Sequence, residues 1–432
     1  MAIPLNLCLV WTFFCLLFES SVGVTIREID GEKAIELPIH RAKHPAQSLL
    51  EFVGSKGLLK NGTARQNSHL QDVFKKLKMA PAPVKNETFT IFKRFDSDFY
   101  ALIRIGKPAN LTYKFVVDTS WADTWVVSEN CKEWTCDNKD KYNAKRSNTS
   151  HPDGRNFYLD LGQGTFGGNL TGILAIDTFK FAHMNATNVT FAEVSNIPWF
   201  MYFTRYDGIL GMSRGTENLQ GAPLIWRELV RQNKIKRNMF SLYLNRDPTS
   251  DRAGSILIGA ADPHHYNGST SATVPLTSDK YWQFHIKDLG FSYVKNKKKK
   301  RKPVLEFCKG AACLAKLASG GNIIIGPTAA IKQIHQLIGA QPFFFGFYRV
   351  PCENIAKLPE LYFSFGNKDI VLYGEQYIQQ IFYNGYVLCL STFAPQDGNE
   401  WIFGVPLLSK YYTIYDFDQN TISMTDYKTH EA

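Results

Sequence analysis

The sequence predicts an all-β protein built from two similar lobes, and three observations lead to this prediction. From Phe95 onward, short runs of β-branched and aromatic residues are separated by Gly, Pro, Asn and Asp, which is the pattern of strands joined by turns. Helical periodicity in this region is confined to residues 224–235 and 329–340. A weak internal duplication also relates the two halves.

The duplication pairs a turn of small residues with a later apolar-apolar-Gly sequence. The Asp-Thr-Ser at 118–120 follows YKFVV, and Gly211, ninety-three residues after Asp118, ends the sequence Ile-Leu-Gly. In the second half, Ala318 follows CLAKL, and Gly404, eighty-six residues later, ends Ile-Phe-Gly. Two similar lobes that face each other would explain this repetition.

Individual strands are predicted by short β-branched and aromatic stretches. In chain order they are FYALIRIG (99–106), YKFVVDT (113–119), TWVVS (124–128), NFYLDLG (156–162), GILAIDTFKF (172–181), FSLYL (240–244) and GSILIGA (254–260). We further expect FSYV and PVLEF, on either side of residues 295–302, to form a hairpin.

The first 23 residues predict a signal peptide. The apolar run MAIPLNLCLVWTFFCLLFES is followed by small residues that end at Gly23. A membrane anchor is the alternative, but the run is short for a spanning helix and no basic cluster follows it at once. We therefore expect export, and no membrane span once the signal has been removed.

Residues 24–94 predict a basic prosegment, with 13 basic and 7 acidic side chains and short helical patterns before MAPAPV. Residues 95–432 hold 36 basic and 31 acidic side chains, and seven of these basic residues lie between Lys295 and Lys302. The net charge of +10 thus comes from the leader and one loop, which argues against a nucleic-acid-binding face. We expect Lys295–Lys302 to be a hairpin tip that is cleaved, binds a sulfated glycan or is simply solvated.

The cysteines agree with export. Six follow the signal, and an even number in an exported chain suggests disulfides. Their spacing favours two tight loops and one wider pair, namely Cys131–Cys136, Cys308–Cys313 and Cys352–Cys389. Zinc is the rival interpretation, but no His pair lies at ligand spacing near either short pair, so we predict no metal and no cofactor.

Eight Asn-x-Ser/Thr sequences follow the signal, and together they predict a glycosylated surface. They begin at Asn61, Asn86, Asn110, Asn148, Asn169, Asn185, Asn188 and Asn267.

Residues 95–432 resemble the pepsin-like aspartic peptidases. The matching stretches occur in order and include FVVDTSWADTWVVS, YDGILGM, GSILIGAADPHHYNG, YWQFHI, IIIGPTAAI and YYTIYDFD, and the leader IELPIHRAKHP is similar to the start of the family's prosegment. The resemblance implies a bilobal pepsin-like acid protease fold, with a cleft for peptides between an N-terminal β-lobe (95–267) and a C-terminal β-lobe (268–432). In the family, each lobe supplies one catalytic aspartate from an Asp-Thr/Ser-Gly turn.

The first of these turns is present as Asp118-Thr119-Ser120, in which Ser120 is a mild departure from Gly. The chemistry needs two carboxylates that share one proton across a bound water. Two such close charges cannot both ionise, so one acts as the base and the other as the acid.

The second turn lacks its acid. The family places this aspartate five residues after the second cysteine of the short loop and eight before Gly-Pro, and both counts lead to Ala318. The turn is Ala318-Ser319-Gly320, and residues 314–330 contain no Asp or Glu. Ser319 could still form a hydrogen bond opposite Thr119, so the turn could keep its structural role.

Two further departures concern the flap and the side chain beside the first turn. The family carries Tyr before Gly-x-Gly in the flap, whereas Leu161 precedes Gly162 and Gly164 here. Trp121 stands at a position beside the first turn that the family usually fills with a small residue. Residues 162–167 also match GxGxxG, but no helix or βαβ unit follows, so we expect a glycine-rich hairpin rather than a nucleotide site.

Three functions compete. The first is a non-catalytic peptidase homologue whose cleft binds a peptide or protein. The second is an active aspartic endopeptidase that hydrolyses proteins at acid pH. The third is a secreted glycoprotein with a vestigial cleft. In each case we expect a monomer that is extracellular or lies in the lumen of an acidic secretory-pathway compartment.

Overall fold

The computed structural model describes most of the region that resembles the peptidases and part of the leader. The described residues are 24–42, 47–48, 51, 80–81, 98–108, 112–161, 167–181, 184–215, 221–245, 253–266, 268–293, 302–309, 313–343, 346–383 and 386–427. In this part of the chain, no helix is long and apolar enough to cross a membrane. The expected signal peptide lies outside the described residues.

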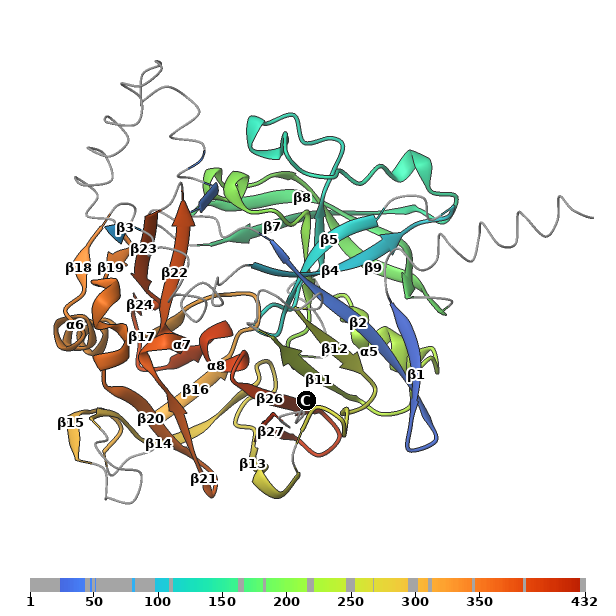
Figure 1. Ribbon diagram of the computed structural model, residues 1–432. Helices are drawn as coiled ribbons and strands as arrows, with labels where there is room; N and C mark the ends of the chain where they lie inside the picture. Colours follow the sequence, from blue (N-terminus) through green and yellow to red (C-terminus); the bar gives the residue numbers. More distant parts are fainter. Residues whose placement is uncertain are drawn as a thin grey trace, which may run out of the picture.

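The largest sheet has fourteen strands among the described residues, and it joins the first half of the chain to the C-terminus (Figure 1). Its members are β1 (Thr25–Ile29), β2 (Glu32–Ala42), β4 (Asp98–Ile105), β5 (Thr112–Asp118), β6 (Trp125–Val127), β7 (His151–Asp160), β8 (Asn169–Phe181), β9 (Met184–Asn196), β10 (Gly208–Gly211), β11 (Met239–Leu244), β12 (Gly254–Ile258), β13 (Ala272–Pro275), β26 (Tyr411–Asp416) and β27 (Thr421–Asp426). The predicted strands between 99 and 260 are all confirmed.

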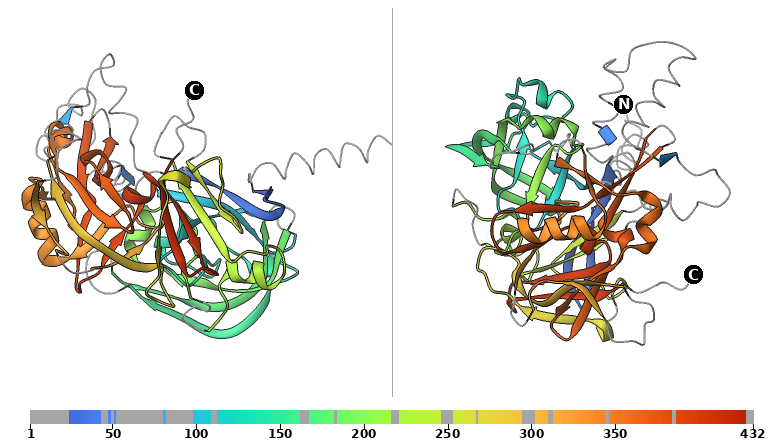
Figure 2. Two further views of the ribbon diagram at one scale, coloured as in Figure 1. Left: turned by 90° about the horizontal axis from the view of Figure 1, so that it is seen from below. Right: turned by 90° about the vertical axis from the view of Figure 1, so that its left-hand side faces the viewer.

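Two further sheets form the second half of the molecule. An eight-stranded sheet contains β14 (Gln283–Ser292), β15 (Pro303–Glu306), β16 (Cys313–Leu317), β17 (Ile324–Pro327), β20 (Glu360–Phe365), β21 (Lys368–Leu372), β24 (Phe393–Gln396) and β25 (Trp401–Phe403). A five-stranded sheet contains β3 (Ala80–Pro81), β18 (Gln341–Pro342), β19 (Tyr348–Arg349), β22 (Ile378–Tyr383) and β23 (Tyr386–Ser391). In the left view of Figure 2, the orange strands of these two sheets lie apart from the cyan and green strands of the first half.

Helices are short and few among the described residues, as the sequence predicts. The two predicted helices are confirmed as α5 (Ile225–Arg231) and α6 (Thr328–Leu337), and two single turns, α7 (Gly374–Tyr377) and α8 (Val405–Leu408), accompany them. In α6, Ile331 and Ile334 are buried, so one face of this helix packs on the core.

The internal duplication of the sequence is confirmed by matching strand pairings. In the first half, β10 runs parallel to β5 and antiparallel to β6, and Gly211 faces Asp118 across the β5–β10 pair. In the second half, β25 runs parallel to β16 and antiparallel to β17, and Phe403 faces Leu317. Each half therefore ends one buried strand at a tight turn, beside a strand that carries the apolar-apolar-Gly sequence.

Three disulfides form as the spacing predicts. They join Cys131 to Cys136, Cys308 to Cys313 and Cys352 to Cys389. The predicted hairpin around the basic loop is confirmed in its flanks, because β14 pairs antiparallel with β15. Within the basic loop itself, only Lys302 is among the described residues.

The leader takes part in the fold, which the sequence does not predict. Its strand β2 lies between β12 and β4 in the largest sheet, and β3 pairs with β23 of the second half. The short helical pattern at residues 48–53 is helical where it is described, at Ser48 and Glu51. The second helical pattern of the leader, at residues 69–78, lies outside the described residues.

Candidate active-site region

Asp118 is held rigidly at the end of β5. From Phe115 to Asp118 every residue of the strand is buried, and the strand is paired on both sides, with β4 and with β10. The backbone carbonyl of Asp118 accepts a hydrogen bond of 2.9 Å from the Met212 N–H, just beyond β10. The side chain of Asp118 is buried, and the residue is only 5% exposed.

The carboxylate of Asp118 is bound by its own turn. Its Oδ1 accepts hydrogen bonds from the Ser120 backbone N–H (2.8 Å) and the Ser120 hydroxyl (2.6 Å). Burial raises the pKa of Asp118, and the hydrogen bonds from Ser120 and the Gly320 N–H oppose this rise. The Ser120 hydroxyl therefore gives the carboxylate one hydrogen bond that a Gly at this position could not donate.

Ala318 takes the corresponding place after β16. Its backbone N–H donates a 3.0 Å hydrogen bond to the carbonyl of Phe403, on the strand that carries the second apolar-apolar-Gly sequence. The side chain is a methyl group, and the residue is half-buried. This turn thus contributes no ionisable group.

The two turns are joined by a reciprocal set of four hydrogen bonds, which we call the Thr119–Ser319 latch. The Thr119 N–H donates to Ser319 Oγ and the Ser319 N–H donates to Thr119 Oγ1, each at 3.1 Å. Each hydroxyl then donates to a carbonyl of the opposite strand, Thr119 to Leu317 at 2.9 Å and Ser319 to Val117 at 2.6 Å. Because both residues are buried, the latch fixes the turns to each other.

Gly320 brings the second turn into contact with the first carboxylate. A Cβ at position 320 would lie 2.1 Å from Asp118 Oδ2, far inside a van der Waals contact. Only Gly fits here, and its backbone N–H donates to the carboxylate. Six residues that the sequence assigns to the site lie in these two adjacent turns, namely Asp118, Thr119, Ser120, Ala318, Ser319 and Gly320.

No second carboxylate acts on Asp118 within the described residues. Burial shifts the pKa of Asp118, and so do the hydrogen bonds from Ser120 and Gly320. Neither of these two residues is an acid. In the same part of the chain, no three His, Cys, Asp or Glu side chains are grouped so that they could hold a metal ion. The acid that the second turn lacks is thus not replaced from elsewhere in the described chain.

The flap position is occupied by an apolar side chain. Leu161 follows β7, and its N–H donates a 2.8 Å hydrogen bond to the Gly168 carbonyl, just before β8. Together with Trp121 and Phe200, the half-buried Leu161 packs against a core cluster that contains Trp125. Gly162 and Gly164 lie outside the described residues, but β7 and β8 pair antiparallel on either side of them, as expected for a hairpin.

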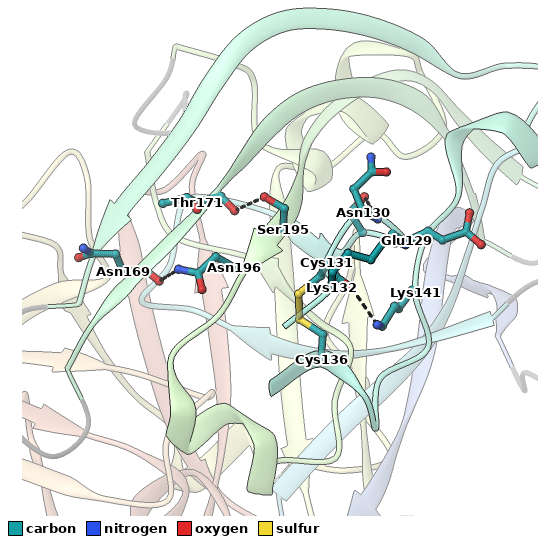
Figure 3. Close-up of a disulfide and its surroundings, with 11 residues drawn as sticks. Glu129, Asn130, Cys131, Lys132, Cys136, Lys141, Asn169, Thr171, Ser195 and Asn196 are labelled. Carbon is teal, nitrogen blue, oxygen red and sulfur yellow. Dashed lines mark hydrogen bonds between the residues drawn. A yellow bond between two sulfur atoms is a disulfide. The ribbon is translucent and has the colours of Figure 1, made fainter. Parts of the chain in front are cut away.

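The first short disulfide lies in the same lobe, as Figure 3 shows. Lys141 Nζ donates a 2.9 Å hydrogen bond to the Cys131 carbonyl, so the Cys131–Cys136 loop is tied to the segment that follows it.

The Asn169 backbone carbonyl, at the start of β8, accepts a 3.3 Å hydrogen bond from the Asn196 side chain. Asn169 itself is exposed.

The other predicted glycosylation sites are divided between the described and undescribed parts of the chain. Asn148 and Asn188 are exposed and Asn185 is half-buried. Asn61, Asn86, Asn110 and Asn267 lie outside the described residues.

Tyr415 lies beneath the latch, and the sequence analysis does not identify it. It is fully buried on β26, stacked on Phe240 at 4.5 Å and edge-on to Trp282 at 5.2 Å. Burial raises the pKa of its phenol, and the charge of the nearby Asp118 raises this pKa further. The stretch YYTIYDFD contributes to the family resemblance, but nothing in it indicates which tyrosine points toward Thr119.

Two β-lobes that present facing Asp-Thr-Ser and Ala-Ser-Gly turns define the architecture of an aspartic protease with one altered turn. Residues 98–427 match the family model described as eukaryotic aspartyl protease, and the chain belongs to this family. It is similar to cathepsin D of Gallus gallus, with 33% identity over 81% of this chain and 86% of that protein. It is also similar to cathepsin D of Mus musculus (31% identity, 77% of this chain and 81% of that protein) and of Homo sapiens (28%, 91% and 94%).

Proposed function

We propose that this chain is a non-catalytic member of the aspartyl protease family that binds a peptide or protein segment between its two lobes. The observation that carries this proposal is the pairing of Asp118 with Ala318 across the intact Thr119–Ser319 latch. The latch joins the two turns, and the second turn carries the methyl group of Ala318 where the family has an acid.

The chemical reason is the need for two ionisable groups. One carboxylate must take a proton from water while the other donates to the scissile carbonyl, and this division of roles arises from two coupled carboxyls with different pKa values. Asp118 has no coupled partner among the described residues. It can hold a water molecule or donate a hydrogen bond when protonated, but it cannot be the acid and the base in one step.

Three features support retained binding. The latch and Gly320 keep the two turns within contact of each other. Asp118 offers a buried carboxyl whose raised pKa favours the protonated form, which can donate to a peptide carbonyl. Trp121 and Leu161 add apolar surface beside the turn, suited to an apolar side chain of the bound segment.

The wider setting follows from the sequence and belongs to the same proposal. We propose a signal peptide at 1–23, a prosegment at 24–94 and lobes at 95–267 and 268–432. The protein is a monomeric glycoprotein that is secreted or stays in the lumen of an acidic secretory-pathway compartment. Lys295–Lys302 is a candidate site for a sulfated glycan.

An active acid endopeptidase is the second candidate, because the chain belongs to a protease family and keeps one complete turn. It requires an acid that is not among the groups that act on Asp118 in the described residues. A vestigial glycoprotein is the third candidate, and it predicts neither hydrolysis nor binding.

The test is calorimetric titration of the purified protein with a peptide that mimics the tetrahedral intermediate, at acid and neutral pH. We expect saturable binding to the wild type and weaker binding to Asp118→Ala, because the methyl group can neither donate nor accept the hydrogen bonds that the carboxyl offers. Lys33→Gln, far along the sequence and exposed, is the matched control and should bind as the wild type does. No binding at any pH would favour the vestigial glycoprotein.

A further inference from the structure

The two joined turns use their backbone N–H groups differently. In the first turn, the N–H of Ser120, two residues after Asp118, donates to the Asp118 carboxylate at 2.8 Å. In the second turn, the equivalent N–H belongs to Gly320, two residues after Ala318, and no acid precedes it in that turn. This N–H donates instead to Asp118 of the first turn. The second turn thus keeps a donor for an oxyanion but lacks a carboxylate of its own.

The symmetry of the latch makes positions 118 and 318 equivalent. Each position directly precedes a residue of the latch, and the two latch residues exchange the same pair of hydrogen bonds. Asp118 carries a carboxyl group at its position and Ala318 only a methyl group, so the second turn is smaller by one carboxyl group. Ala318 is half-buried and Gly320 is exposed, so the second turn is partly open to solvent.

The Asp118 carboxyl presents one of its oxygens to the second turn. Both hydrogen bonds from Ser120 go to Oδ1. Oδ2 is the oxygen beside Gly320, since a Cβ at position 320 would lie 2.1 Å from it. When Asp118 is protonated on Oδ2, this oxygen can donate a hydrogen bond to an acceptor that lies beside the second turn.

The surroundings of Asp118 favour a shared proton over a pair of negative charges. Burial raises the pKa of Asp118, so its carboxyl keeps the proton to a higher pH than an exposed aspartate does. Within the described part of the chain, no charged side chain is among the groups that shift this pKa. The charge of Asp118 acts on the phenol of Tyr415, which burial keeps neutral. A second carboxylate brought beside Asp118 would therefore be held by sharing its proton rather than by a cation.

We propose that the second turn receives a carboxyl group of the bound segment, which accepts the Gly320 N–H and shares one proton with Asp118. The ligand is thus a peptide with a free carboxyl group, at its C-terminus or on an Asp or Glu side chain. This inference rests on the proposed function, because it names the chemistry of the segment bound between the lobes. The complex holds one proton for two carboxyls, and this proton comes from Asp118 below its pKa and from solvent above it.

The experiment is calorimetric titration of the purified protein with two peptides that share the sequence of the N-terminal half of the tetrahedral mimic. One peptide ends in a free carboxyl group and the other in a carboxamide. At about pH 5 a C-terminal carboxyl is ionised. We expect the acid to bind at least about tenfold tighter than the amide there, because hydrogen bonds to an ionised acceptor are about twice as strong as neutral ones.

A third peptide carries an internal Asp before a terminal carboxamide, and tighter binding of this peptide than of the amide assigns the site to side-chain carboxyls as well. Binding of the mimic together with equal affinities for all three peptides overturns this inference and leaves the proposed function standing. If neither the mimic nor any of the peptides binds, the proposed function fails too.

Three variants test whether the second turn holds the carboxyl. Ala318→Asp supplies this group from the chain itself, so we expect it to remove the preference for the acid over the amide. Ala329→Asp makes the same change at an exposed position of α6, and this matched control should keep the wild-type preference. A preference that survives in Ala318→Asp would contradict the assigned place.

Asp118→Asn separates proton sharing from shape. In the wild type, the preference for the acid should disappear by about pH 7, because two ionised carboxyls repel each other. The amide of Asp118→Asn donates at every pH, so this variant should still prefer the acid at about pH 7. If the variant loses the preference over the same pH range as the wild type, Asp118 does not share a proton with the ligand.

Discussion

Thr119 and Ser319 lie two hundred residues apart, yet the backbone N–H of each donates to the hydroxyl of the other at 3.1 Å. Each hydroxyl also donates to a carbonyl of the opposite strand, at Leu317 and Val117. The symmetry of this exchange is complete, whereas the residues that precede Thr119 and Ser319 differ, as Asp118 and Ala318. The chain thus keeps the framework of a two-acid site and lacks one of the acids.

The first prediction concerns the latch. Ser319→Ala removes two hydrogen bonds and leaves the Thr119 N–H and Val117 carbonyl without these partners in a buried site. We expect a loss of about 1–3 kcal/mol in the free energy of unfolding, measured by urea denaturation. Ser319→Thr keeps the hydroxyl and is the control. If Ser319→Ala has the same free energy of unfolding as the wild type, the latch does not stabilise the contact between the lobes.

The second prediction concerns the contact between Gly320 and Asp118. In Gly320→Ala the new Cβ would lie 2.1 Å from Asp118 Oδ2, so either the turn or the carboxylate must move. We expect a loss of about 1–3 kcal/mol in stability and loss of binding to the transition-state mimic. Gly321→Ala is the neighbouring control, because its Cβ would come no closer than 3.3 Å to a side-chain atom of Ile323. Equal behaviour of the two variants would refute this geometry.

The third prediction restores the missing acid. Ala318→Asp should place a carboxylate opposite Asp118, because Ala318 occupies its turn with the backbone hydrogen bond to Phe403 intact. We expect weak acid endopeptidase activity, several orders of magnitude below an intact dyad enzyme, because Leu161 cannot donate a hydrogen bond from the flap. Adding Leu161→Tyr should raise it by more than an additive effect, in an assay of a quenched fluorescent peptide.

The control for this restoration is Ala318→Asn, which has nearly the same shape but cannot share a proton. It should be inactive at every pH. If Ala318→Asp folds but is no more active than Ala318→Asn, the second turn does not present its side chain to Asp118.

The fourth prediction concerns stability in acid. His335 on α6 is buried, stacks on Tyr348 at 3.9 Å and shares a 3.2 Å hydrogen bond with the Ser391 hydroxyl. Burial lowers its pKa from 6.5 to about 4, which a hydrogen bond with the Phe393 backbone opposes. The folded state therefore holds a neutral ring while the unfolded state gains a proton below about pH 6.5.

Stability from this group is complete above about pH 6.5 and is lost as the pH falls toward about 4, by at most about 3 kcal/mol. His335→Gln has no such group, so its unfolding free energy should change less over this range than that of the wild type. Urea denaturation at a series of pH values measures the difference. Parallel curves for the two proteins would show that His335 is not responsible.

Much of the site could be predicted from the sequence because its positions are defined by local spacing. The resemblance to the family locates Ala318 through short counts from Cys313 and Gly326, and in the structure Ala318 directly precedes Ser319 of the latch. Strands of alternating β-branched and aromatic residues, such as β8 and β11, were likewise predictable from local pattern. These features depend on residues that are near one another in the chain.

The rest depends on contacts between distant segments. The composition of residues 24–94 predicts a separate basic leader. In the structure, however, β2 of this leader pairs with β12 and β4, which are more than fifty residues away in the chain. Its apolar residues are few and are interrupted by Glu36 and Pro38, and such a short pattern does not distinguish a central strand from a helix or a loop. The position of Tyr415 beneath Thr119 arises in the same way, from the pairing of β26 with β11.

The most direct test of the central claim is hydrolysis of an acid-denatured protein by the purified wild type, with Asp118→Asn in parallel, between about pH 3 and 7. The assay is run on the intact chain and on the chain after proteolytic removal of the predicted prosegment, residues 24–94. We predict no cleavage products above the Asp118→Asn background at any pH, because Ala318 supplies no second carboxyl. Cleavage by the wild type that Asp118→Asn abolishes would contradict this account and establish an active aspartic endopeptidase.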